Sequence, residues 1–186
     1  MGAFDGKGGI MKPLRVSGQI EWYALFTYLS VVNSYSLDRE SHVVGCGYYT
    51  GSGDTSAGIF RMQNDGHLQW FLQVTPEAAN FNLCYGIHYD DTLDWSYALF
   101  LTTSSEFSTT GFEDLAILIF DNVGNLKKGK KISLGANVQF NSKTENSFLL
   151  PLGDQFIFAG ATTGFTTELQ SETFTNSKTN VFVMKY

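Results

Sequence analysis

The stretch "FDNVGNL" at residues 120–126 has two counterparts further up the chain. "MQNDGHL" occupies residues 62–68, and "FDGKGGI" occupies residues 4–10. The glycines in register are Gly8, Gly66 and Gly124, which follow one another at a constant interval of 58 residues. Asp and Asn near Gly are typical of tight turns, because Gly accepts a positive φ and Asx side chains bond nearby backbone groups. The interval indicates an internal repeat, so we expect three equivalent hairpin turns with left-handed glycines.

Each repeat contains four strand-like pieces, because apolar residues alternate in short runs between turn signals. The first pieces are residues 42–50, 97–105 and 155–163. The second are 58–63, 115–121 and 181–186. The third are 10–18, 67–74 and 125–135. The fourth are 22–32, 81–89 and 146–151. The first piece is small or apolar on both faces, with Gly45, Gly47, Ala159 and Gly160. This pattern places it innermost and the fourth piece outermost.

Four antiparallel strands in roughly 40 to 60 residues are typical of a β-propeller blade. We predict an all-β fold in which residues 1–186 form a single β-propeller-like repeat domain. It is expected to hold about three four-stranded blades of 58 residues: a partial blade 4–35, blades 42–92 and 97–152, and a partial blade 155–186. A closed propeller needs at least about four blades. The chain is therefore expected to be part of a larger propeller, or to have its edges covered by another chain.

Several motifs resemble those of the seven-bladed-propeller repeat family. The family pattern runs roughly G-x-x-Y-V-x-G-x-T, then D-x-F-V-x-K, then G-x-x-x-W. The residues that fit are Phe156, Phe158, Gly160 and Thr162 in the first motif, Phe182, Val183 and Lys185 in the second, and Gly66 and Trp70 in the third. Asn180 stands where the family has Asp, and the copy at 115–131 has Ile119 for the Lys and Lys128 for the Trp. The resemblance implies a propeller used as an interaction scaffold, with no shared catalytic residues.

Composition narrows the function classes. The chain has 186 residues, 43% of them hydrophobic and 15% aromatic, which is enough for one domain with a core. Its net charge of −6 and pI near 4.9 give no attraction for nucleic acid or anionic membranes. "MGAFDGKGG" lacks the features of a signal peptide. Cys46 and Cys84 are too few for a disulfide scaffold and lack metal-ligand spacing, so the compartment stays open.

The candidate chemical groups do not form a motif. His42, His67 and His88 fall on different pieces of the repeat and are not expected to converge. Cys46 is expected to be a small buried residue without a neighbouring base. Asp90, Asp91 and Asp94 carry oxygen ligands suited to Ca²⁺, but their spacing does not match an EF-hand and a solvated loop is expected. Asp65 and Asp121 are expected to form turns. We therefore assign no catalytic, cofactor-binding or metal-binding residues.

Three other features bear on binding. The lysines of "KKGKK" (127–131) should divide between two faces of a strand, because side chains alternate there. The tryptophans Trp22, Trp70 and Trp95 could line a carbohydrate platform, although Trp70 occupies a packing position of the motif. The loops 51–57 and 104–114 and the longer one after Gly160 are polar and suited to hydrogen bonding.

The leading hypothesis is a non-enzymatic β-propeller scaffold that binds or assembles with a protein partner. A carbohydrate-binding or adhesive propeller is the second hypothesis, and it requires exposed Trp or Tyr on one face. An enzyme with a site in the central channel is the third, and it requires carboxylates or histidines on inner strands. A homodimer or flanking blades would complete the ring, so apolar edges around Tyr23–Phe26 and Val181–Met184 should be exposed in the isolated chain.

Overall fold

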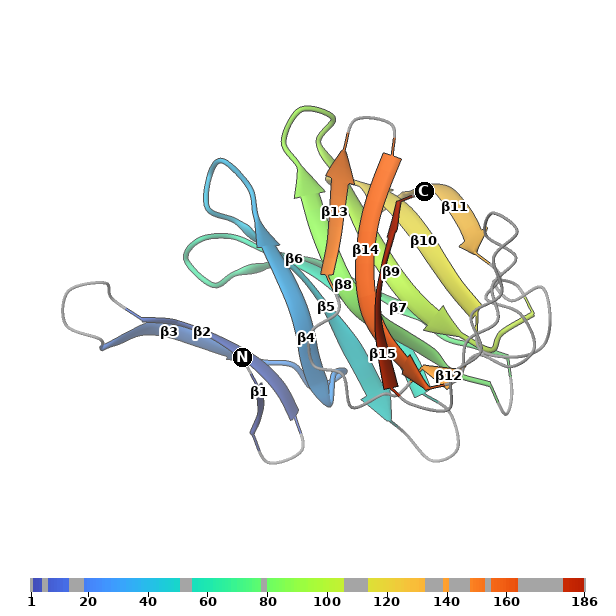
Figure 1. Cartoon of the computed structure of the whole chain (residues 1–186). Coiled ribbons are helices and arrows are strands. Elements are labelled where there is room, and N and C mark those ends of the chain that lie inside the picture. Colours follow the sequence, from blue (N-terminus) through green and yellow to red (C-terminus); the bar gives the residue numbers. More distant parts are fainter. Residues whose placement is uncertain are drawn as a thin grey trace.

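The structure is a computed structural model that describes residues 2–4, 7–13, 19–50, 55–77, 80–105, 114–132, 139–140, 148–152, 155–163 and 179–185. Every regular element among these residues is a β-strand, and each pairing between strands in a sheet is antiparallel (Figure 1). The predicted all-β class is therefore confirmed. No helix able to cross a bilayer occurs in this described part of the chain.

The strands form four sheets, each made of strands that follow one another in the chain. The first sheet contains β1 (Gly2–Phe4), β2 (Lys7–Pro13) and β3 (Ile20–Leu25). The second contains β4 (Val31–Leu37), β5 (Val43–Thr50), β6 (Thr55–Met62) and β7 (Leu68–Val74). The third contains β8 (Asn82–Asp90), β9 (Trp95–Thr102), β10 (Asp114–Asp121) and β11 (Leu126–Ile132). The fourth contains β12 (Gln139–Phe140), β13 (Phe148–Leu152), β14 (Gln155–Thr163) and β15 (Thr179–Lys185).

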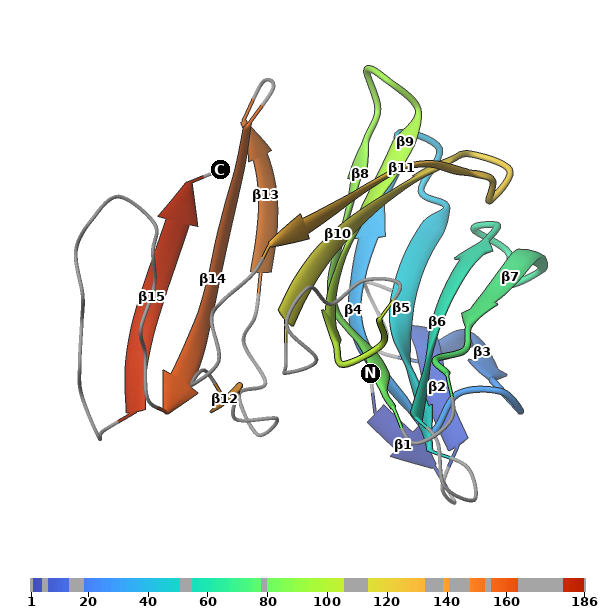
Figure 2. The ribbon, with the colours of Figure 1, turned by 90° about the vertical axis from the view of Figure 1, so that its right-hand side faces the viewer.

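Successive sheets contact one another through β4, β8 and β13, each of which lies at an edge of its sheet. Strand β8 lies against β4, β5 and β6 of the preceding sheet, and β13 lies against β8 in turn. Figure 2 shows this succession from left to right, with β13–β15, β8–β11 and β4–β7 side by side. The interface between the second and third sheets buries Val44, Ile59, Phe100, Leu118 and Phe120. A second apolar cluster joins the first two sheets and includes Ile10, Phe26, Leu29, Phe60 and Met62.

The strand order within a sheet differs from the predicted order. The piece at 81–89 was expected to be the outer strand of blade 42–92, but β8 pairs with β9 of the following sheet. In the same way β4 pairs with β5, and β13 with β14. The short turns after β4 and β8 favour hairpins between these neighbours. The fourth pieces at 81–89 and 146–151 therefore form the edge strands β8 and β13 of the following sheets, and the first pieces lie second in their sheets. We call β4, β8 and β13 the inner strands.

The N-terminal copy is also in a different register from the one expected. Residues 10–18 were expected to correspond to 67–74, but Trp22 of β3 pairs with Lys12 just as Trp70 of β7 pairs with Arg61. Strand β3 is therefore the equivalent of β7, and residues 31–37, not the predicted 22–32, correspond to the fourth pieces at 81–89 and 146–151. Gly8 lies within β2 opposite Ala3. Its predicted place in a left-handed turn is wrong, because Gly8 lies inside the paired part of the strand.

The predicted turns at Gly66 and Gly124 are confirmed. Their φ angles are +92° and +88°, and they close equivalent hairpins between β6 and β7 and between β10 and β11. A tryptophan of the preceding sheet covers each turn: a Cβ added to Gly66 would lie 3.0 Å from the ring of Trp22, and one added to Gly124 would lie 3.1 Å from the ring of Trp70. The two indoles donate to the carbonyls of Asn64 and Asn122, each at 2.8 Å. We call this repeated contact the tryptophan clasp.

Acid should weaken the second of these hairpins. The Lys127 ammonium, 2.9 Å from Asp121, holds the pKa of that carboxyl far below its usual range, and hydrogen bonds from Asn125 and Val123 act in the same direction. Because the folded pKa is depressed, the stabilisation is present above the unfolded pKa of about 4 and is lost as the pH falls below it. We expect Asp121→Asn to lower the urea midpoint at pH 7 and to have a smaller effect at pH 3. An equal effect at both values would contradict this assignment.

The two cysteines join adjacent sheets. Cys46 of β5 and Cys84 of β8 are fully buried and form a disulfide with their Cα atoms 5.8 Å apart. Burial of Cys46 was expected, but its bond to Cys84 was not. This single disulfide lies within the apolar core between the two sheets and adds a covalent link to it.

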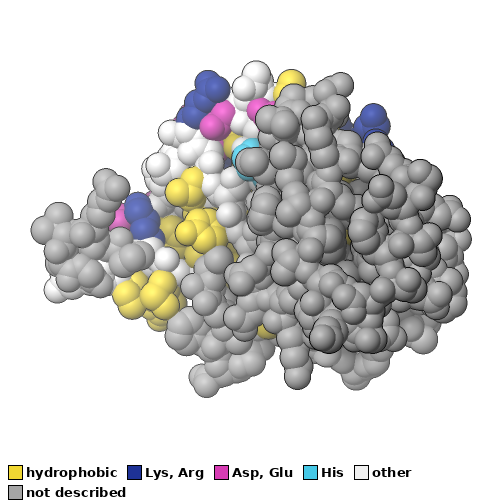
Figure 3. All heavy atoms as spheres, in the orientation of Figure 1, with side chains coloured by type: hydrophobic (Ala, Val, Ile, Leu, Met, Phe, Trp, Pro, Cys, Tyr) yellow, Lys and Arg dark blue, Asp and Glu magenta, His cyan; other side chains and the backbone are white. Residues whose placement is uncertain are grey.

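Exposed side chains are unevenly distributed. Hydrophobic side chains reach the surface over the N-terminal strands (Figure 3), and the large ones there are Met11, Ile20, Tyr23, Leu25, Tyr35 and Leu37. The exposure predicted around Tyr23–Phe26 is confirmed for Tyr23 but not for Phe26, which is buried. The predicted exposure of Val181–Met184 concerns side chains that the structure does not describe.

The lysines of β11 divide between two faces of the strand, as predicted. Lys128 and Lys130 pair with Ile119 and Ile117, whereas Lys131 pairs with Ala116.

Candidate functional site

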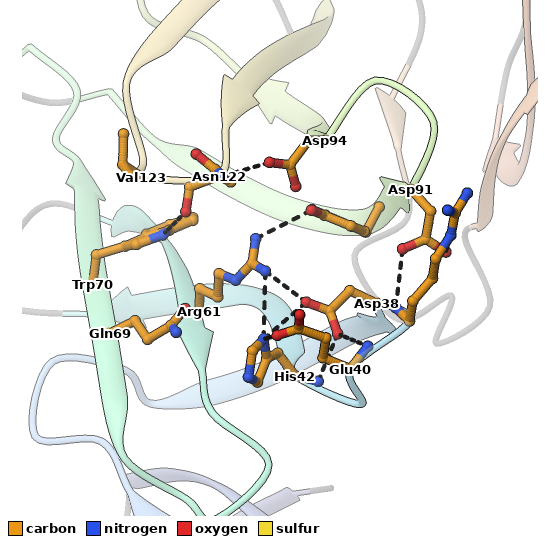
Figure 4. A pocket seen from close by; sticks show the side chains of 12 residues that line it. Asp38, Glu40, His42, Arg61, Gln69, Trp70, Asp91, Asp94, Asn122 and Val123 are labelled. Atoms are coloured by element: carbon orange, nitrogen blue, oxygen red, sulfur yellow. Dashed lines mark hydrogen bonds and ion pairs between the residues drawn. The ribbon is translucent and has the colours of Figure 1, made fainter.

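A cleft of about 700 Å³ opens between the second and third sheets, at the end where β4 turns into β5 and β8 into β9. The hairpin turn between β10 and β11 forms another part of its wall. Its lining residues are Asp38, Arg39, Glu40, His42, Arg61, Gln69, Trp70, Tyr89, Asp91, Asp94, Asn122 and Val123 (Figure 4). This volume lies within the range of sites for small ligands.

The turn after β4 is organised by one carboxylate. Asp38 Oδ1 accepts the backbone N–H groups of Glu40 and His42 at 2.9 and 2.8 Å. Ser41, in the same turn, has a φ of +63°. Such Asx bonds are the local reason why an aspartate begins the turn. They also orient the second oxygen of Asp38 toward the cleft.

A buried ion pair lies at the centre of the cleft. Arg61 of β6 places Nη2 2.6 Å from Asp38 Oδ2, and the exposed fractions of the two side chains are only 9% and 5%. Arg61 Nη1 donates to the hydroxyl of Tyr89 at 3.3 Å, and the guanidinium lies 5.0 Å from the centre of that ring. His42 Nδ1 lies 3.0 Å from Asp38 Oδ2. Arg61 therefore connects the second sheet with β8 of the third.

The upper wall carries a second set of polar contacts. Asn122 donates its side-chain amide to Asp94, and its backbone carbonyl receives the indole N–H of Trp70. Asp91 accepts the backbone N–H of Arg39 at 3.0 Å, and the guanidinium of Arg39 lies 3.7 Å from the same carboxylate. Figure 4 shows Arg61 in the middle of the cleft. Asp94 and Asn122 lie on one side of its guanidinium, and Asp38 and His42 lie on the other side.

Only some of the histidines and aspartates considered as candidates from the sequence line this cleft. His42 lines the cleft, whereas His67 sits in the exposed β6–β7 turn beside Asp65, and neither it nor His88 lines the cleft. Burial of His88 in β8 lowers its pKa. Asp90 caps its own turn by accepting the N–H groups of Thr92 and Leu93, while Asp91 and Asp94 face other partners. Among the described residues, no three metal-ligating side chains converge.

The cleft contains acidic, basic and imidazole groups, but their hydrogen bonds do not link a nucleophile to a base. A catalytic pair needs a reactive atom within reach of an acceptor that is itself free to take a proton. Here the carboxylate of Asp38 is used by Arg61 and by the turn, and Asp94 is engaged by an amide. These two carboxylates are therefore engaged by neighbouring groups of the protein itself.

Sequence reasoning missed Asp38 and Arg61, the two residues at the centre of the cleft. Asp38 and Asp90 begin equivalent turns, which could have drawn attention to Asp38. Arg61 fills the position where the family motif has a lysine and where Ile119 stands in the next copy. The loops expected to bind ligands, at 51–57, 104–114 and after Gly160, lie largely outside the described residues.

Comparisons with known proteins leave the function open. No protein-family model matches the chain, and no curated protein matches it. A crystal structure of a protein of unknown function from Bacteroides caccae aligns with 98% of this chain and 70% of its own, with 11% sequence identity and a TM-score of 0.40.

Proposed function

We propose that this chain is a non-enzymatic scaffold of the β-propeller type that binds a protein partner. A stack of antiparallel sheets of three or four strands, in which each inner strand lies on the preceding sheet, supports the propeller arrangement. The resemblance of its motifs to propeller repeats points in the same direction. The exposure of two inner-strand side chains, Tyr35 and Leu37, carries the proposal of a partner.

Strands β4 and β8 hold the same place in successive sheets, so their side chains can be compared. Leu37 and Tyr89 each precede the aspartate of the following turn, and Tyr35 and Ile87 lie two residues earlier. Tyr89 and Ile87 are each only 5% exposed, because they pack against the second sheet. Leu37 is 52% exposed and Tyr35 is 48% exposed. The described strands of the first sheet include no inner strand that would cover them.

The edge of β1 offers the place for such a strand. Its equivalents β5 and β9 are paired on both edges, with β4 and β8 as their inner neighbours. Among the described strands, β1 pairs only with β2. A strand added to β1 would extend the first sheet inward, toward β4. Strand addition at a sheet edge is a common mode of protein recognition.

The proposal is tested by the association of the isolated chain. We expect the wild-type chain to self-associate at micromolar concentration, because an uncovered apolar face favours contact with another chain. The double variant Tyr35→Ser/Leu37→Ser should weaken this association at least tenfold, as measured by sedimentation equilibrium. Its urea midpoint should change little, since both side chains are half exposed.

The matched control is Leu126→Ser, which changes an equally exposed leucine on β11 and should leave the association unchanged. A wild-type chain that stays a compact monomer at high concentration would contradict the proposal. Association that resists the double variant would place the contact on another surface.

A further inference from the structure

We infer that the first sheet binds the fourth sheet of a second copy of this chain, so that two copies join head to tail in one closed ring. The inference rests on the proposed scaffold role and names the partner and the contact face. It is carried by a comparison of equivalent positions in three sheets and by the sequence of the fourth. We call the face that a sheet turns toward the sheet before it the leading face.

One position of the leading face can be compared in three sheets. Met11 of β2, Phe60 of β6 and Leu118 of β10 occupy it, because each pairs with the residue that follows the tryptophan position of the next strand. Phe60 is fully buried and Leu118 is 2% exposed, since the preceding sheet covers each of them. The ring of Phe60 lies 4.3 Å from that of Phe26, which follows β3. Met11, by contrast, is 38% exposed.

The next strand shows the same difference. The ring of Phe71 on β7 lies 5.9 Å from that of Tyr28, in the connection after β3. Its equivalent Tyr23 is 69% exposed, and Leu25, on the same side of β3, is 46% exposed. The opposite side of β3 carries Trp22, which packs against the cluster between the first two sheets. The leading face of the first sheet is therefore apolar and has no cover among the described sheets.

The fourth sheet stands at the other end of the described stack (Figure 2). Its strands β14 and β15 contain unbroken apolar runs, "FIFAGA" at 156–161 and "VFVM" at 181–184. Successive residues of a strand belong to opposite faces, and an unbroken run is typical of a strand covered on both of them. The third sheet can cover only one face. A second cover is therefore expected for the fourth sheet as well.

Contact between these two ends would continue the stacking that the chain already uses. Strand β8 lies against the second sheet, and β13 lies against β8, so each leading face is covered by the sheet before it. The fourth sheet of a second copy can take this place on the first sheet. Such a head-to-tail contact closes into a ring when the rotation allows it. Two copies of four sheets make eight, and propellers typically have about four to eight blades.

The first experiment measures the association by sedimentation equilibrium. We expect the wild-type chain to form a dimer whose mass does not rise further with concentration. Tyr23→Ser/Leu25→Ser should raise the dissociation constant of this dimer at least tenfold. The urea midpoint should change little, since both side chains are largely exposed. The matched control is Leu68→Ser/Leu126→Ser, an equally exposed pair on β7 and β11, which should leave the dissociation constant unchanged.

The second experiment identifies the face that Tyr23 meets. Both cysteines of the chain are in the buried disulfide, so Tyr23→Cys introduces a single thiol that can carry a photoreactive cross-linker. Mixing ¹⁴N- and ¹⁵N-labelled chains separates links between copies from links within one copy. We expect the links between copies to join position 23 to residues 148–185. Links to residues 2–25 of the second copy would mean that two first sheets face each other, and would overturn the head-to-tail contact.

The outcomes separate this inference from the proposed function. Association that Tyr23→Ser/Leu25→Ser leaves at full strength would overturn the inference alone, as would a mass that keeps rising with concentration. Loss of the dimer in that variant but not in Tyr35→Ser/Leu37→Ser would support the inference and contradict the contact around Tyr35 and Leu37. A wild-type chain that stays monomeric would contradict the proposed function itself.

Discussion

Replacing Asp38 with alanine is expected to lower the free energy of unfolding by about 3–5 kcal/mol, because it leaves the Arg61 guanidinium buried without its counter-charge. The two side chains are 5% and 9% exposed, so water cannot take over the role of the carboxylate. The same change removes the acceptor for the N–H groups of Glu40 and His42, which opens the turn after β4. Urea unfolding monitored by circular dichroism measures the loss.

Two further variants separate these effects. Asp38→Asn keeps an acceptor for the turn but removes the charge, so it should lie between wild type and Asp38→Ala. The double variant Asp38→Ala/Arg61→Leu removes both charges and should recover about 1 kcal/mol or more relative to Asp38→Ala, since contacting residues are not additive. If the double variant were as unstable as the sum of the single variants, Arg61 would not depend on Asp38.

Local chemistry explains which parts of the fold were predictable. The turns at Gly66 and Gly124 follow from a glycine with positive φ and from Asx bonds within a few residues, and both were found as expected. The prediction for the N-terminal copy failed because the constant interval was extended to Gly8, which lies inside a strand and not in a turn. The pairs Lys12–Trp22 and Arg61–Trp70 mark the true register.

The choice of partner for each inner strand was harder to predict from the repeat. A periodic chain can be divided into repeats at any of its connections. The predicted boundary between blades 42–92 and 97–152 separated β8 from β9. The lengths of the connections would have corrected it, because β8 and β9 are joined by a four-residue turn, whereas the connection from β7 to β8 is longer. Short connections favour hairpins between consecutive strands.

The cleft could not be predicted from sequence patterns, because its residues meet only in three dimensions. Asp38 and Arg61 lie 23 residues apart, and Tyr89 comes from the next sheet. The disulfide between Cys46 and Cys84 has the same character, since it depends on two sheets facing each other. The sequence therefore indicated the repeat unit, whereas the contacts between units determine the site.

The tryptophan clasp accounts for the recurrence of the glycine turn better than the turn geometry alone. Gly124 needs a positive φ, and it also lies beneath the ring of Trp70, which belongs to the preceding sheet. The same holds for Gly66 beneath Trp22. Lys128 occupies the position of these tryptophans in the third sheet. A glycine at this turn is thus required both by its own backbone and by the contact between sheets.

Gly124→Val is therefore expected to lower the free energy of unfolding by about 3 kcal/mol. A β-branched residue at φ +88° costs about 1–3 kcal/mol in backbone strain. The new Cβ would also lie 3.1 Å from Trp70 Cδ2, so the indole must move, and its bond to the carbonyl of Asn122 is disturbed. Urea unfolding gives the free energy, and the near-ultraviolet circular dichroism of Trp70 reports the displacement.

Two matched variants distinguish the backbone strain from the contact. Gly124→Asn tolerates the positive φ but still meets the ring, so it should retain the spectral change with a smaller loss of stability. Val123→Ala, at the neighbouring exposed position, should change the stability by less than about 0.5 kcal/mol. A Gly124→Val variant with an unaltered Trp70 signal would mean that the glycine serves the turn alone, and the clasp would lose its place as the reason why the motif recurs.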